Sequence, residues 1–215
     1  MKVVNTVLIL LIPSLLLGVL ILRNNAKLGS INVNLGTDIE YDSLEVATFA
    51  GGCFWCMESA FEASDGVVEA VSGYTGGTVV NPTYEQVSRG QTGHLEAVQV
   101  YYDPQIISYE ELLAVYWRSV DPTDDGGQFF DRGSQYKTAI FYHDETQRKL
   151  ATEAKEDLDK SGRFSKPVVT EILEFRVFYR AEDYHQDYYK KNVLNYKIYS
   201  NASGREEFIE KHWGK

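Results

Sequence analysis

The chain has 215 residues, 44% hydrophobic and 24% charged, which is enough for one domain with a buried core and an additional segment. The formal net charge is -10, and no basic stripe is available to neutralise phosphates. A nucleic-acid partner is therefore not expected. A monomer is expected.

The amino-terminal segment is almost wholly apolar from Val3 to Leu22, a run of about 20 residues. At a rise of 1.5 Å per residue, such a helix spans a hydrocarbon core of roughly 30 Å. We predict a membrane anchor over residues 1–23, a polar linker over 24–44, and a catalytic domain held outside the cytoplasm. A cleaved signal peptide is the alternative, although no clear small-residue cleavage site follows. A buried core helix fits less well, because a polar stretch follows the run.

Strand and helix patterns alternate along the remaining body, residues 45–215. Runs of β-formers predict strands over 45–50, 67–74, 94–102, 136–142 and 168–175. Helical patterns cover 54–63, 108–120, 144–160, 181–191 and 205–213, and Ser108 and Glu111 form a capping box. Because crossovers are few and no G-x-G-x-x-G turn occurs, we expect an α+β fold. Its form would be a two-layer α/β plait, a ferredoxin-like mixed sheet with helices on one face, long coil and a carboxyl-terminal tail.

The two cysteines, Cys53 and Cys56, are the most informative residues. A disulfide closing so short a loop contributes roughly 2 kcal/mol, against about 4.7 kcal/mol for a 100-residue loop, so the pair suits chemistry better than support. Gly51 and Gly52 allow a sharp turn that leaves Cys53 at a helix N-terminus, where the helix dipole lowers the pKa of a thiol. Cys56 returns to the same helix face and can reach an oxidised Cys53.

No metal or cofactor is predicted. A tetrathiolate zinc site needs a second cysteine pair, which the sequence lacks. A c-type haem needs histidine after the second cysteine, where this chain has Met57. The four histidines lack ligand spacing, so His94 is interpreted as structural, and His185 is left outside the predicted site. Two buried, inert thiols remain an alternative.

Several blocks of sequence, in this order along the chain, resemble the A-type peptide methionine sulfoxide reductases. They are GGCFWCME at 51–58, GYTGG at 73–77, NPTY at 81–84, GHLEAV at 93–98, DPT at 121–123, DRGSQY at 131–136 and AEDYHQ at 181–186. Each block is weak evidence, but together they cover nearly the whole body. The resemblance implies reduction of the S epimer of methionine sulfoxide, free or in proteins, since one enzyme type serves each epimer.

The resemblance also implies roles for particular residues. Cys53 would be the nucleophile and Glu96 the acid that protonates the sulfoxide oxygen. Phe54 and Trp55 would form a cage for the substrate methyl group, although adjacent aromatic residues are more often plain core.

Three more polar residues receive roles from the resemblance alone. Tyr84 and Tyr136 would donate hydroxyl hydrogen bonds to the sulfoxide oxygen, and Asp131 would contact the substrate backbone.

The role of Glu96 also has a chemical argument. A sulfoxide oxygen leaves only once it is protonated, and a carboxyl of pKa near 4.3 is ionised at pH 7 unless burial raises its pKa. We therefore hypothesise that Glu96 is buried and holds its proton in the resting enzyme. A solvated strand glutamate is the plainer interpretation of the segment alone.

The carboxyl-terminal tail departs from the family pattern. Many members carry resolving cysteines there, and this tail has none. Cys56 is then the thiol available to attack the Cys53 sulfenic acid, and a thioredoxin-like protein would reduce the resulting disulfide. An external thiol acting directly on the sulfenic acid is the alternative.

Two other functions are compatible with parts of the sequence. A C-x-x-C pair after a strand also suits a thioredoxin-like dithiol–disulfide oxidoreductase, in which Glu96 and Asp131 would have no task. A membrane-tethered module that binds oxidised or methionine-rich proteins without turnover is a non-enzymatic alternative.

Overall fold

The computed structural model describes residues 43–214. The predicted anchor, residues 1–23, and nearly all of the predicted linker, residues 24–44, lie outside this part of the chain. Among the helices within residues 43–214, none combines the length and hydrophobicity that a membrane crossing requires.

Strands and helices alternate through the first two thirds of the described residues, and helices dominate the tail. The strands are β1 (Glu45–Gly51), β2 (Val67–Thr75), β3 (Leu95–Tyr102), β4 (Gly127–Gln128), β5 (Asp131–Arg132), β6 (Thr138–Tyr142), β7 (Glu171–Glu174) and β8 (Phe178–Arg180). The α-helices are α1 (Phe54–Glu62), α2 (Tyr84–Ser88), α3 (Tyr109–Ser119), α4 (Glu145–Lys160), α5 (Tyr188–Lys191), α6 (Val193–Ala202) and α7 (Arg205–Trp213). A 3-10 turn covers Ser134–Tyr136.

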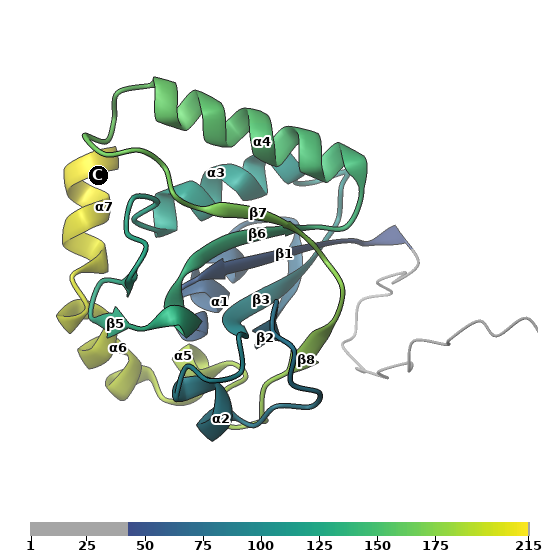
Figure 1. The fold of residues 1–215 in the computed structure, drawn as a ribbon, viewed down its shortest axis with the longest axis vertical. Coiled ribbons are helices and arrows are strands. Elements are labelled where there is room, and N and C mark those ends of the chain that lie inside the picture. Colours follow the sequence, from purple (N-terminus) through teal and green to yellow (C-terminus); the bar gives the residue numbers. More distant parts are fainter. Residues whose placement is uncertain (1–42, 215) are drawn as a thin grey trace, which may run out of the picture. The chain divides into compact units, whose positions relative to one another are not determined.

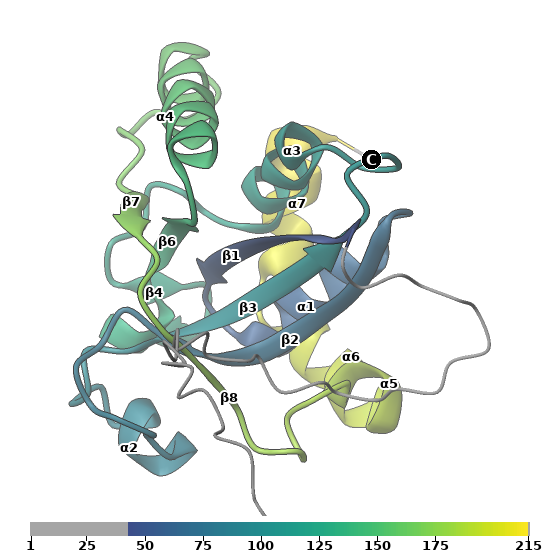
Figure 2. The ribbon, with the colours of Figure 1, turned by 90° about the vertical axis from the view of Figure 1, so that its right-hand side faces the viewer.

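One mixed sheet organises the fold, with strand order β7-β6-β1-β3-β2-β8. β6 and β7 are parallel, and the other neighbours are antiparallel. β4 and β5 form a separate hairpin. Figure 1 shows β1 and β3 at the centre of the sheet, and Figure 2 shows its curl.

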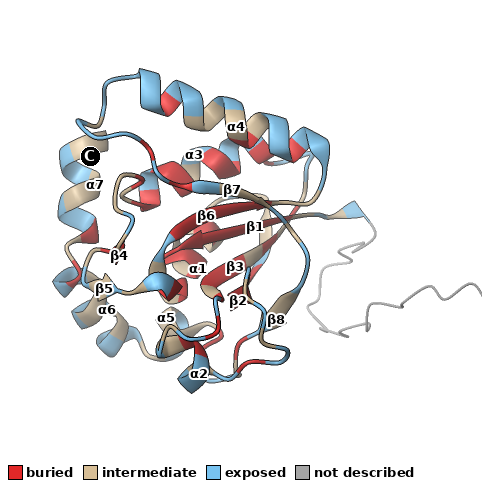
Figure 3. Cartoon of the chain, in the orientation of Figure 1, coloured by how far each residue is buried: buried red, intermediate tan, exposed pale blue. Residues whose placement is uncertain are grey.

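The core lies between this sheet and the layer of α1, α3 and α4. Figure 3 shows buried residues concentrated on the central strands and on the inner faces of α1 and α3. Phe49 of β1 is fully buried, and its ring stacks on Phe61 at 4.8 Å and on Tyr116 at 5.2 Å between centroids. A smaller apolar cluster around Phe141 forms a second group of buried side chains. This packing holds the end of β1, and therefore the first residues of α1, in a fixed place.

The predicted two-layer α/β plait with a mixed sheet is confirmed. The capping box of α3 is present, with Ser108 accepting from the backbone N–H of Glu111. α4 begins after Asp144 and ends at Lys160, as its pattern predicts.

Three predicted boundaries are wrong. The strand expected from residue 136 begins at Thr138, because residues 134–136 form the 3-10 turn. The strand expected over 168–175 is confined to Glu171–Glu174. The helix expected over 181–191 begins only at Tyr188: Asp187 has a left-handed φ of 53°, and the Gln186 amide pairs with the backbone of Ser72 instead of continuing a helix.

Candidate active site

A tight turn between β1 and α1 places the first cysteine. Gly52 has a φ of 83°, and a Cβ there would lie 2.6 Å from the Cβ of Gln128, so both the conformation and the space require glycine. Cys53 is the N-cap residue of α1, and its carbonyl accepts from the backbone N–H of Cys56 at 3.1 Å. Both thiols are free, and each cysteine is 5% exposed. The turn thus places Cys53 at the start of a helix, as the sequence predicts, and the structure shows in addition that both thiols are buried.

The charge within this dithiol is distributed differently from the prediction. Burial, followed by the neighbouring Cys56, raises the pKa of Cys53 well above its usual value. The hydrogen bond from Cys53 lowers the pKa of Cys56 to about 7, against an opposing effect of burial. In the substrate-free site these effects oppose ionisation of Cys53 and favour ionisation of Cys56. The expected low-pKa thiolate at Cys53 is wrong for this state, because the helix terminus is covered and not open to water.

Glu96 lies on β3, opposite Tyr74 of β2, and is 2% exposed. Its Oε2 accepts from the backbone N–H of Phe54 at 3.2 Å. Burial, only partly opposed by this hydrogen bond, raises the pKa of Glu96 to about 8. The carboxyl is therefore mainly protonated at pH 7, which agrees with the hypothesis of a resident proton donor.

A small cavity of about 70 Å³ opens beside the cysteine pair. The predicted site residues other than Cys56 meet at this cavity, together with one residue that was not predicted, Tyr199. Its walls are Cys53, Phe54, Trp55, Tyr84, Glu96, Asp131, Tyr136 and Tyr199. Cys56 lies three residues further along α1, behind Cys53. Residues from five separate parts of the chain therefore converge on one thiol.

Hydroxyl groups form the polar side of the cavity. The Tyr136 hydroxyl lies in hydrogen-bonding contact with that of Tyr84, whose pKa is raised to about 12 chiefly by burial. The Tyr199 hydroxyl donates to Oδ2 of Asp131 and also contacts the sulfur of Cys53. Burial raises the pKa of Asp131, while the bond from Tyr199 opposes that effect. Neutral hydroxyls thus surround the space next to the Cys53 sulfur.

Aromatic rings form the apolar side. Phe54 and Trp55 lie 6.3 Å apart between centroids, and Trp55 stacks on Tyr188 of α5 at 3.8 Å. The indole Nε1–H of Trp55 donates to Nδ1 of the buried His185 at 3.2 Å. The His185 ring also packs against Phe54 and Tyr84. His185 therefore orients the cage from behind without lining the cavity.

Sequence reasoning missed Tyr199 and left His185 outside the site. Tyr199 was one of 15 tyrosines, in a helix that the sequence pattern did not predict. His185 belongs to one of the family blocks, which was the available signal. His94, by contrast, is structural as predicted: Gly77 N–H donates to its Nδ1 at 3.1 Å, and its Nε2 contacts the carbonyl of Val79 at 2.7 Å.

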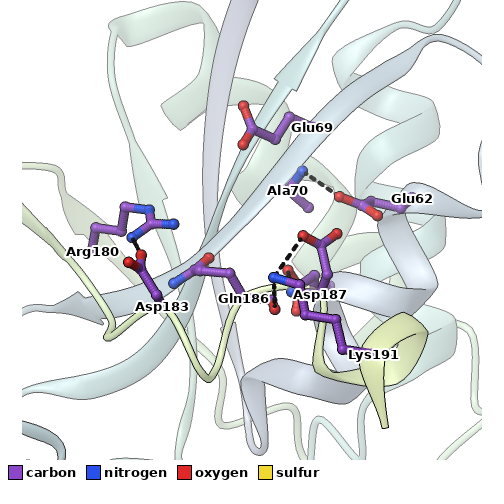
Figure 4. Close-up of a pocket in the computed structure, with 9 residues that line it drawn as sticks. Glu62, Glu69, Ala70, Arg180, Asp183, Gln186, Asp187 and Lys191 are labelled. Atoms are coloured by element: carbon purple, nitrogen blue, oxygen red, sulfur yellow. Dashed lines mark hydrogen bonds and ion pairs between the residues drawn. The ribbon is translucent and has the colours of Figure 1, made fainter. Parts of the chain in front are cut away.

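A larger polar pocket, of about 320 Å³, lies on another side of α1 (Figure 4). Glu58 accepts there from the backbone N–H of Asp187 at 2.8 Å and from the Ser72 hydroxyl at 3.2 Å. The Lys190 ammonium lies 2.5 Å from Glu62 and 3.0 Å from Asp187. Lys190 and these hydrogen bonds already satisfy the carboxylates of Glu58, Glu62 and Asp187, which connect α1 to α5.

A buried dithiol, a carboxyl whose pKa is raised by burial, and an aromatic cage lie around one small cavity, an arrangement that suits a thiol-dependent oxidoreductase. The family model described as peptide methionine sulfoxide reductase matches residues 45–215. The chain belongs to this family.

Relatives with closely similar sequences are known. The peptide methionine sulfoxide reductase MsrA of Bacillus pumilus is 59% identical over 169 residues, which cover 79% of this chain and 95% of the relative. MsrA 2 of Staphylococcus aureus is 57% identical over 170 residues, covering 79% of this chain and 96% of the relative.

Solved structures share the fold. Reduced Mxr1 from Saccharomyces cerevisiae has a TM-score of 0.67 and 31% identity, covering 71% of this chain and 87% of that one. Methionine sulfoxide reductase A of Corynebacterium diphtheriae has a TM-score of 0.64 and 33% identity, covering 71% of this chain and 76% of that one.

Proposed function

We propose that the chain is a peptide-methionine (S)-S-oxide reductase that repairs oxidised methionine, free or in proteins. The observation that carries the proposal is the burial of Glu96 beside Cys53, which raises the pKa of Glu96 to about 8, in a cavity closed on one side by Phe54 and Trp55. The substrate of a disulfide-exchange enzyme has no sulfoxide oxygen that must be protonated before it leaves. The acid therefore favours sulfoxide reduction over the thioredoxin-like alternative.

The first half of the cycle transfers the sulfoxide oxygen to the enzyme. The Cys53 thiol passes its proton to the Cys56 thiolate across their hydrogen bond, and its sulfur attacks the sulfoxide. Glu96 gives its proton to the oxygen. The hydroxyl group passes from the substrate sulfur to the Cys53 sulfur, the transient sulfur–sulfur bond breaks, methionine leaves, and Cys53 becomes a sulfenic acid. Methionine sulfoxide is reduced by two electrons, and the Cys53 sulfur is oxidised by two.

Substrate recognition divides between the two sides of the cavity. The rings of Phe54 and Trp55 take the methyl group, the hydroxyls of Tyr84 and Tyr136 donate to the oxygen, and Asp131 contacts the peptide backbone. The neutral hydroxyls of the two tyrosines suit the binding of this oxygen, because a sulfoxide oxygen carries partial negative charge and can only accept hydrogen bonds.

The second half of the cycle restores the thiols. Cys56, as a thiolate, attacks the sulfenic sulfur of Cys53, and hydroxide leaves with a proton as water. A thioredoxin-like dithiol protein then reduces the disulfide and becomes oxidised itself. Two facts support Cys56 as resolver: the chain has no other cysteine, and Cys56 is three residues from Cys53 along one helix.

The decisive experiment is turnover of each methionine sulfoxide epimer by the full chain with dithiothreitol. We expect reduction of the S epimer alone, and its loss in Cys53→Ser. A folded protein that turns over neither epimer, but reduces insulin strongly, would support the disulfide-exchange alternative. Binding of oxidised peptides that survives Cys53→Ser, without turnover by the wild type, would support a binding module.

The resolving role is tested separately. Cys56→Ser should still release methionine once per enzyme and accumulate the sulfenic acid, which a dimedone-type probe traps. With a thioredoxin system, multiple turnover should fall sharply. Undiminished turnover would assign resolution to an external thiol.

We also propose, from the sequence, that residues 1–23 attach the domain of residues 45–215 to a membrane through the linker at 24–44, with the domain extracytoplasmic. The apolar run from Val3 to Leu22 supports this. Alkaline extraction of cell membranes tests it: the full chain should stay with the pellet, whereas a signal-cleaved, exported protein should be released and begin beyond residue 23.

A further inference from the structure

The first turn of α7 buries a positive charge against the active-site turn. Arg205 is 6% exposed, and its guanidinium donates to the carbonyls of Ser119 and Gly51, the latter at 3.0 Å. It also contacts Sδ of Met57 at 3.7 Å, and its Nε has no partner within the described residues. Nor does any carboxylate there form an ion pair with it. The guanidinium carbon also lies 4.7 Å from the centre of the Phe129 ring, and its charge lowers the pKa of Asp131. A buried cation is costly unless an anion lies nearby.

The preceding helix supplies a second group. Tyr196 of α6 contacts Cys56 through its hydroxyl, which donates to the sulfur. Arg205 acts on the same sulfur through its charge. Two residues of the carboxyl-terminal tail thus converge on Cys56 from separate helices.

Cys56 needs such support most in the second half of the cycle. In the reduced enzyme, the Cys53 thiol is the main cause of the low Cys56 pKa, followed by Arg205 and Tyr196 as the favourable contributions. After the first step that thiol hydrogen is gone, because the Cys53 sulfur carries a hydroxyl instead. Cys56 has also taken up a proton and must release it again.

We propose that Tyr196 and Arg205 are positioning residues for resolution, which hold Cys56 as a thiolate while Cys53 is a sulfenic acid. This inference rests on the proposed role of Cys56 as the resolving thiol. In a tail without cysteines, these two side chains activate a resolving thiol that lies on α1.

The other charged groups near Cys56 do not replace this support. Asp131 raises the pKa of Cys56, and a carboxylate at Glu96 would act in the same direction. The groups that face Cys56 from the elements around it are Cys53 on α1, Glu96 on β3, Asp131 on β5, Tyr196 on α6 and Arg205 on α7. Arg205 is the cation of this set.

The test isolates Cys56 in the full chain carrying Cys53→Ser, which removes the neighbouring thiol. Its thiolate is titrated by ultraviolet absorbance and by the pH dependence of alkylation with iodoacetamide. Adding Arg205→Met should raise the Cys56 midpoint by roughly one pH unit or more. At pH 6 the alkylated fraction at a fixed time should fall up to about tenfold. Arg205→Lys should restore much of the shift.

Two further variants guard against indirect effects. Tyr196→Phe removes one hydroxyl at little risk to folding and should raise the midpoint by a smaller amount. Lys197→Met removes an exposed cation from the same helix and should leave the midpoint unchanged. An unchanged midpoint in both folded Arg205→Met and Tyr196→Phe would overturn the inference, as would an equal shift in Lys197→Met.

This readout is independent of turnover. If the midpoint shifts but Cys56→Ser supports full thioredoxin-linked turnover, the electrostatic support of Cys56 is real and its resolving role fails. With both intact, disulfide formation after one equivalent of sulfoxide should shift its pH profile upward in Arg205→Met, by the same amount as the titration.

Discussion

The backbone N–H of Phe54 donates to Oε2 of Glu96 over 3.2 Å. This bond ties the proposed acid to the first residue of the helix that begins after Cys53, so the donor and the nucleophile keep a fixed separation. It also favours the carboxylate that forms when Glu96 gives up its proton, because free N–H groups at a helix N-terminus stabilise anions. The same hydrogen bond therefore positions the proposed acid and stabilises the negative charge that Glu96 acquires when it loses its proton.

Removing the proton should slow the oxygen-transfer step. Glu96→Gln keeps an oxygen that can accept from Phe54 but has no acidic hydrogen. We expect the rate of methionine release in a single turnover to fall about 10²- to 10⁴-fold, as for other general acids. Glu58→Gln is a matched control, since Glu58 is also a buried carboxyl with a pKa raised by burial, to about 7, and lies outside the cavity. An equal loss in the two variants would contradict a catalytic role for Glu96.

The pH dependence of that step should report the same group. Because burial raises the pKa of Glu96 to about 8, the donor is protonated below this pH and lost above it. The single-turnover rate should decline about tenfold per pH unit on the alkaline side of pH 8. Stopped-flow measurement of wild type and Glu96→Gln checks this, and the variant should lack the alkaline decline. A decline of the same slope in the variant would assign it to another group.

The buried acid should also cost stability. The folded-state pKa of Glu96, about 8, lies above its ordinary value of 4.5, so the folded state binds more protons between these two pH values. Stability is then lost as pH rises through this window, on the order of a few kcal/mol in all. Calorimetry should show that Glu96→Gln gains Tm over wild type as pH increases from 5 to 8. A constant difference in Tm would rule out this linkage.

The support of the aromatic cage can be tested through His185. His185→Phe keeps a ring against Phe54 but removes the acceptor of the Trp55 indole N–H. An unsatisfied buried donor costs about 1–3 kcal/mol, so Trp55 should lose its fixed orientation. We expect KM for a methionine sulfoxide peptide to rise about tenfold with a smaller change in kcat. His143→Phe serves as the control, because His143 pairs with Thr48 and does not line the cavity. Equal KM values for His185→Phe and wild type would contradict a role of His185 in substrate binding.

Much of this arrangement could be predicted from local sequence patterns. Gly51 and Gly52 before Cys53 indicate the turn, and the capping residues Ser108 and Asp144 mark the starts of α3 and α4. These features depend on neighbours in sequence, so they can be recognised without knowledge of the fold. The family blocks then supplied the residues of the cavity other than Tyr199.

The remainder depends on contacts between distant residues. The raised pKa of Cys53 and the lowered pKa of Cys56 follow from burial and from the hydrogen bond between the two thiols. The position of the pair on the helix does not by itself reveal either effect. Residues 181–187 have a helical composition, but Gln186 satisfies backbone groups of Ser72, 114 positions away, and this outweighs local propensity. Tyr199 contacts Cys53, and Arg205 contacts Gly51, only when the tail packs against the active-site turn.

The hydrogen bond from Arg205 to the carbonyl of Gly51 joins residues 154 positions apart. During synthesis both cysteines are made long before the guanidinium that contacts their turn. A nascent or carboxyl-terminally truncated protein therefore contains its thiols without the support of its tail. The active-site turn therefore gains this contact only once α7 has been made, and proteolytic removal of the whole of α7 would take the contact away.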